Sequence, residues 1–144
     1  MIEQDTVKLL RECDAGVKMG VDSIESVLPY THSLTLKKYL SDCKGQHREL
    51  EQLIQKQLDK FGDDGKKPST MAKSMSHMKT NMKLGMHQND HTVADLITDG
   101  CNMGVKSLNR YLNQYKAADE MSKDITKRLI NAEEQLAVQI RSFL

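Results

Sequence analysis

Two stretches of this chain, AGVKMGVDSIESVL at residues 15–28 and DGCNMGVKSLNRYL at residues 99–112, match each other without a gap. The identical pairs are Gly16 with Gly100, Met19–Val21 with Met103–Val105, Ser23 with Ser107 and Leu28 with Leu112. Similarity at a fixed separation is typical of an internal repeat. A weaker match follows each stretch, EQL at 51–53 and EQL at 134–136, one residue out of phase. We therefore expect two helical hairpins of similar construction, residues 6–61 and 91–144.

Apolar residues on both sides of the repeat recur at helical spacing and form wide stripes. They predict four helices, at residues 6–28, 34–61 and 91–115 and from a turn near Lys116–Asp119 to the C-terminus. Asp5 or Thr6 can cap the first helix, and Pro29 ends it. Gly62 supplies a left-handed stop for the second helix.

The composition supports an all-α domain. The 144 residues are about one domain in length, with no Trp, two Phe and two Pro, and strong helix formers dominate. Neither predicted hairpin can bury its apolar face alone, but pairing the two gives one four-helix core. The repeated glycines stand four residues apart, which would let helix backbones approach closely. We expect residues 1–144 to form a single four-helix bundle.

A methionine-rich segment lies between the hairpins. Five methionines, at 71, 75, 78, 82 and 86, fall on one helical stripe, among lysines and without acids. A helix of about 16 residues spans roughly 24 Å, so residues 69–86 could return the chain along the bundle. Methionine is flexible and suits packing over an irregular groove. We predict a crossover helix that packs on its own bundle or on a symmetric neighbour; thioether binding of Cu(I) and attachment to a membrane surface are the alternatives.

The order of these segments resembles the ferritin-like bundles. The motifs LLRECDAGVKMG, GQHRELEQLIQKQL, TMAKSMSHMKTNM and DLITDGCNMGVKSLNRYL cover most of the chain. They are most similar to the uncharacterised bacterial ferritin-like proteins of a domain-of-unknown-function family, with spore-coat-type proteins as more distant relatives. The resemblance implies a four-helix bundle with a helical crossover, and it implies little about activity.

The ligand pattern of di-iron ferritin-like proteins is missing. Such centres take a carboxylate from each of two helices and Glu-x-x-His from each of the other two. None of the eight glutamates here is followed by histidine three residues later. The sequence also lacks a phosphate-binding loop and a nucleophile–base arrangement. We therefore expect no catalytic residues, no cofactor and no standard metal centre.

His47 is the residue that keeps a metal site open as an alternative. It lies in the apolar stripe of the second helix, four residues after Cys43, so the two share a face. Asp14, at the margin of the first helix, could add a third ligand. The competing interpretation, which we prefer, is a buried core histidine hydrogen-bonded to Asp14 or Glu12. His87 and His91 suit a metal less well, because Asn89 and Asp90 are typical of a turn and helix cap.

Charge and cysteine content limit the classes of function that we expect for this chain. The net charge of +1 gives no general case for nucleic acid binding. Three widely spaced cysteines do not suggest a secreted disulfide framework, and the N-terminus lacks the apolar core of a signal peptide. We expect a cytoplasmic, non-catalytic bundle that works through protein contacts or as a homo-oligomer. The alternative is a metal-binding bundle with a non-standard site around His47 and Cys43.

Overall fold

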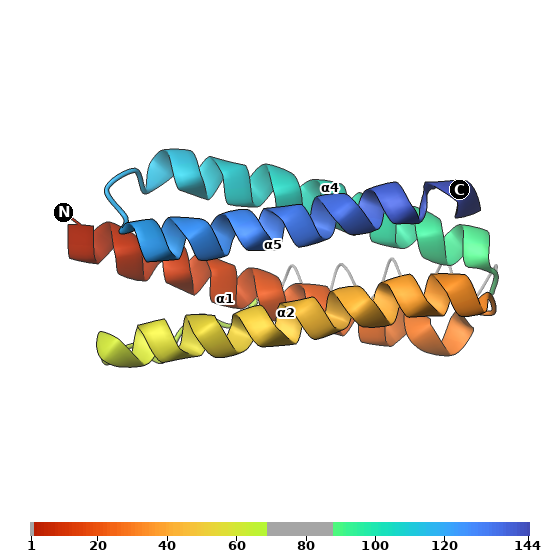
Figure 1. The fold of residues 1–144 in the computed structure, drawn as a ribbon, viewed down its shortest axis with the longest axis horizontal. Helices are drawn as coiled ribbons and strands as arrows, with labels where there is room; N and C mark the ends of the chain where they lie inside the picture. Colours follow the sequence, from red (N-terminus) through yellow and green to blue (C-terminus); the bar gives the residue numbers. More distant parts are fainter. Residues whose placement is uncertain (1, 69–87) are drawn as a thin grey trace.

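The computed structural model describes residues 2–68 and 88–144, and over these ranges the fold is all-α with no strand. Four long helices form a bundle (Figure 1). They are α1 (Ile2–Val27), α2 (Leu34–Lys60), α4 (Asp90–Gln114) and α5 (Glu120–Gln139). Two short 3₁₀ turns, η1 (Leu28–Tyr30) and η2 (Arg141–Phe143), follow α1 and α5. The predicted all-α four-helix bundle is confirmed.

The helices pair as two antiparallel hairpins, α1 with α2 and α4 with α5. Helix α2 also packs against α5, and α1 packs against α4. In Figure 1, α2 ends at the left of the bundle and α4 begins at the right. The end of α2 and the start of α4 therefore lie at opposite ends of the bundle. The predicted crossover helix, 69–86, and its methionine stripe lie outside the described residues.

The start of α1 differs from the prediction. The helix begins at Ile2, so Asp5 and Thr6 do not cap it. Their side chains instead accept hydrogen bonds from the backbone of the α4–α5 turn, at 2.9 Å from Ala117 N to Asp5 and 2.8 Å from Asp119 N to Thr6. A carboxylate and a hydroxyl can satisfy backbone donors of any nearby segment, and sequence proximity alone does not identify which.

The other hairpin turn is held in the same way. Both carboxylate oxygens of Asp90, the first residue of α4, accept backbone hydrogen bonds, from His32 N at 2.7 Å and Ser33 N at 3.0 Å. Thr6 precedes Gly16 by as many residues as Asp90 precedes Gly100. Matched positions near the two helix starts therefore each fix the turn of the opposite hairpin.

The other residues predicted to cap or end helices occupy the positions that the sequence predicted. Asn89 Oδ1 accepts from Thr92 N at 2.8 Å, which confirms the predicted cap of α4. Gly62 adopts a φ of 65°, the left-handed conformation predicted for the end of α2. Pro29 lies within η1, where its fixed φ is compatible with a 3₁₀ turn.

Apolar side chains form two clusters, one in each half of the bundle's length. The first joins the N-terminal half of α1 and the C-terminal half of α2 with Leu108, Ile125 and Leu129. The second joins Ile24 and the N-terminal halves of α2 and α4 with Leu136 and Ile140. Each fully buried Leu or Ile contributes roughly 1.5–3 kcal/mol to folding. Between the clusters lie two buried polar side chains, His47 and Glu133.

Candidate functional site

We call the level between the two clusters the polar layer, and each helix contributes one residue to it. These are Gly20 on α1, His47 on α2, Gly104 on α4 and Glu133 on α5. His47 is 1% exposed and Glu133 is 8% exposed, so both polar side chains are withdrawn from water. The predicted burial of His47 is confirmed.

The two nitrogens of His47 have different partners. Nδ1 lies 2.9 Å from the backbone carbonyl oxygen of Cys43, to which it donates, and 3.5 Å from the Cys43 sulfur. Nε2 lies 3.6 Å from Glu133 Oε1. A proton on Nδ1 leaves Nε2 as the nitrogen that gains or loses a proton opposite Glu133. The partner of the imidazole is therefore a carboxylate of the other hairpin, and the expected partners Asp14 and Glu12 are wrong.

Two glycines of the repeat make room for this pair. A Cβ on Gly20 would lie 2.7 Å from His47 Cδ2 and 2.8 Å from its Nε2. A Cβ on Gly104 would lie 2.8 Å from the carboxyl carbon of Glu133 and would collide with Oε2. By contrast, a Cβ on Gly16 would meet Leu129 at 4.0 Å, and one on Gly100 would meet nothing within 4 Å. The expectation that these glycines bring helix backbones together is corrected: Gly20 and Gly104 accommodate polar side chains.

Burial and charge act against each other on His47. Burial alone lowers its pKa, but the hydrogen bonds and charges of Cys43 and Glu133 outweigh that effect and raise the pKa to about 10. Burial raises the pKa of Glu133, and His47 offsets only part of the rise. Cys101 lies near this layer, where burial and the charges of Glu133 and Cys43 raise its thiol pKa above the usual range. The layer therefore binds protons more firmly than the same groups in water.

The three candidate metal ligands named from the sequence do not all meet in this layer. The structure brings Cys43 and His47 together, as the sequence predicted, but Asp14 lies elsewhere. Within residues 2–68 and 88–144, no three or more His, Cys, Asp and Glu side chains gather closely enough to hold a metal. The di-iron pattern also needs carboxylates from all four helices, whereas the layer residues of α1 and α4 are glycines.

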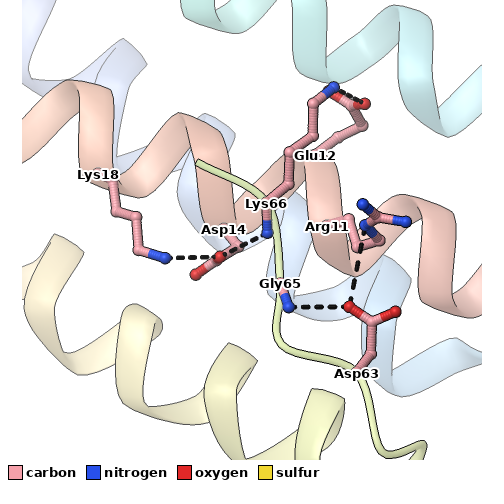
Figure 2. Close-up of polar contacts among 7 residues, drawn as sticks. All are labelled: Arg11, Glu12, Asp14, Lys18, Asp63, Gly65 and Lys66. Carbon is pink, nitrogen blue, oxygen red and sulfur yellow. Dashed lines mark hydrogen bonds and ion pairs between the residues drawn. The ribbon is translucent and has the colours of Figure 1, made fainter. Parts of the chain in front are cut away.

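Asp14 instead anchors the segment that follows α2. It is fully buried, and its Oδ2 accepts from Lys18 Nζ at 2.8 Å and from the backbone N of Lys66 at 3.0 Å (Figure 2). Gly65, with a φ of 86°, lies directly against this carboxylate, where a Cβ would collide with Oδ2. We call residues 62–68 the strap, because Figure 2 shows them crossing α1 at this point. Asp14 Oδ1 is buried without a partner among the described residues.

Charged side chains hold the rest of the strap. Lys66 Nζ lies 2.6 Å from Glu12 Oε1, and Asp63 Oδ1 accepts from Gly65 N at 2.8 Å while Arg11 Nε approaches it at 3.8 Å (Figure 2). A surface depression of about 210 Å³ beside them is lined by Lys8, Arg11, Glu12, Lys66 and Tyr115. These contacts direct the chain back along α1.

Glu133 is the site residue that the sequence analysis missed. It belongs to the apolar stripe of α5, four residues after Leu129 and three before Leu136. That spacing puts a carboxylate on the core face of the helix, and it is the signal that could have identified the residue. His91 is exposed on α4, and His87 lies outside the described residues.

Comparisons with family models, with curated proteins and with solved structures found no match to this chain. Among the described helices, none combines the length and apolar character needed to cross a membrane. Function is therefore inferred from the geometry of the bundle.

Proposed function

We propose that this chain is a non-catalytic, ferritin-like helical bundle that acts through protein contacts, with a second copy of itself as the partner. The end of α2 and the start of α4 lie at opposite ends of the bundle (Figure 1), and this placement supports the ferritin-like topology. The interior side chains that could take part in chemistry or bind a metal are His47, Glu133 and Cys43. They contact one another and the backbone. The three cysteines are free and buried, which suits a reducing compartment such as the cytoplasm.

The observation that carries this proposal is the apolar surface at the ends of the bundle. Leu34 is 81% exposed at the start of α2, and Val138 and Leu144 are each 52% exposed near the chain's C-terminus. Figure 1 shows that α2 begins at the end where α5 finishes. Three further apolar residues, Ile2, Phe61 and Met121, are exposed at the starts of α1 and α5 and the end of α2, which share the opposite end.

A second copy is the simplest partner for such a surface. The same apolar end on two identical chains can pair about a two-fold axis, the commonest symmetry of soluble oligomers. Burying each Leu or Val would contribute on the order of 1–3 kcal/mol before the entropy of association is subtracted. We therefore place the contact at the end formed by Leu34, Val138 and Leu144.

Light scattering coupled to size-exclusion chromatography tests the proposal. We expect the wild-type chain to elute as a dimer and the Leu34→Glu/Val138→Glu variant as a folded monomer, because the two charges would be buried in the contact. Met103→Glu is the matched control, since Met103 is 70% exposed in the middle of α4, away from both ends. A monomeric wild-type chain, or a dimer disrupted by the control alone, would refute the proposal.

Metal binding around His47 and Cys43 is the alternative function, and no contact in the described residues favours it over the His47–Glu133 pair. Elemental analysis of protein purified without added metal separates the two. A stoichiometric metal that disappears in His47→Leu would support the alternative.

A further inference from the structure

The strongest unexplained feature of the bundle is a pair of opposite titratable groups enclosed between its hairpins. His47 belongs to the first hairpin and Glu133 to the second, and the two helices that carry them pack against each other. Their nearest polar atoms are 3.6 Å apart. Glu133 Oε2 is buried without a hydrogen-bond partner among the described residues, so its carboxylate relies on the imidazole for compensation.

Each neighbouring helix contributes a defined group to this pair. On α2, Cys43 meets Nδ1 of His47 through its carbonyl and sulfur. On α4, Cys101 is near enough to Glu133 for the carboxylate's charge to raise its pKa. On α1, the contact with the imidazole is Gly20, which does not titrate. The cation that faces Glu133 in this layer is therefore the protonated ring of His47.

We infer that His47 and Glu133 form a proton-dependent tie between the two hairpins, which is strong while the imidazole is protonated and weakens when that proton leaves. With the proton, an imidazolium faces a carboxylate in an enclosed site. Without it, a neutral ring faces a buried carboxylate whose second oxygen lacks a partner among the described residues. The tie thus makes the stability of the bundle depend on pH.

The direction of that dependence follows from the pKa of His47. Its value in the folded chain, about 10, lies above the ordinary value of 6.5. Such a group stabilises the fold fully below its unfolded pKa, and the contribution is lost as pH rises through the folded pKa. Glu133 acts in the same direction, because burial raises its pKa too. The bundle should therefore lose stability between about pH 6.5 and 10.

Equilibrium unfolding in denaturant, measured at several pH values across this window, tests the inference. One extra proton bound by the folded chain reduces the folding equilibrium constant about tenfold per pH unit. Glu133→Gln removes the carboxylate that faces Nε2, while Cys43 still raises the pKa of His47, so we expect this decline to become smaller and to end at a lower pH. His91→Gln is the control, because it removes an exposed imidazole, and it should keep the wild-type decline.

A second variant separates Glu133 from the neighbouring thiol. Cys43→Ser removes the sulfur, which also raises the pKa of His47, but leaves Glu133 and the backbone carbonyl that accepts from Nδ1, so the decline should become smaller and still be present. Loss of the decline in Cys43→Ser but not in Glu133→Gln would assign the effect to the thiol and overturn the inference.

Nuclear magnetic resonance of the wild-type chain keeps the test valid if a variant fails to fold. The ring signals of His47 are assigned by their absence in His47→Gln. At about pH 8 they should report an imidazolium, and the ring should lose its proton only well above the ordinary pH range of histidine. A ring that is already neutral at that pH would refute the tie, whatever the oligomeric state of the protein.

Discussion

The two hairpins carry the same glycine in the same sequence setting and use it for opposite charges. In the first hairpin, Gly20 of α1 makes room for the imidazole of His47. In the second, Gly104 of α4 makes room for the carboxylate of Glu133. The matching stretches lie on α1 and α4, whereas α2 and α5 match weakly. The two hairpins thus share a similar helix scaffold. They are complementary in charge, because one carries the basic His47 and the other the acidic Glu133.

The strap shows a second difference between the halves. In the first hairpin, the Asp14 carboxylate accepts hydrogen bonds from the Lys18 side chain and from the backbone N of Lys66. The position that matches Asp14 in the second is Thr98, whose hydroxyl is buried without a partner among the described residues. A carboxylate can anchor a returning segment through two charge-assisted bonds, while a threonine offers a single hydroxyl. The two halves therefore also differ where the segment after α2 lies against α1.

The largest expected effect comes from removing one member of the central pair. His47→Leu should destabilise the bundle by about 3–5 kcal/mol at pH 7, because Glu133 is left buried without a counter-charge. The loss should shrink as the pH approaches 10, where the wild-type imidazole gives up its proton. Denaturant unfolding of His47→Leu, Glu133→Leu and the double variant measures the coupling. If the double variant is no more stable than His47→Leu alone, the two hairpins are not complementary in charge.

An intermediate effect is expected at the strap. Asp14→Asn should lower the free energy of unfolding by about 1.5–3 kcal/mol, because hydrogen bonds to a buried charge are lost. Thr98→Val, at the matching position, should change it little, since the hydroxyl that it removes has no partner among the described residues. Limited proteolysis within residues 61–68 should accelerate in Asp14→Asn. Equal losses in the two variants would show that the halves do not differ at this point.

The smallest expected effects distinguish the repeated glycines. Gly20→Ala should cost about 1–2 kcal/mol, because the new methyl meets the packed imidazole ring. Gly104→Ala should cost less, since the carboxylate it meets is the flexible end of a side chain. Gly100→Ala has open space and should gain up to about 1 kcal/mol of helix propensity. Thermal melts of the three variants give the ranking; a stabilised Gly20→Ala would contradict the close approach of this glycine to His47.

Local patterns predicted the helices well, because apolar spacing, Asn89 and Gly62 act through neighbours in the sequence. The partners of His47, Asp5 and Thr6 could not be predicted in this way, because each lies on a helix or turn far along the chain. His47 was expected to meet Asp14 or Glu12 of its own hairpin, and it meets Glu133 of the other. Asp14 was predicted at the margin of an apolar face, but its burial depends on a strap that composition identifies only as a loop.

The reciprocal docking of the two turns bears on how the chain reaches its fold. Isolated hairpins would leave the amides of His32, Ser33, Ala117 and Asp119 to water, since their acceptors belong to the opposite hairpin. Contacts within a hairpin are local and form quickly, but contacts between hairpins require closure of a long loop. Each turn therefore becomes fully ordered only when the second hairpin arrives. This mutual dependence favours a single cooperative folding transition over a stable half-folded intermediate.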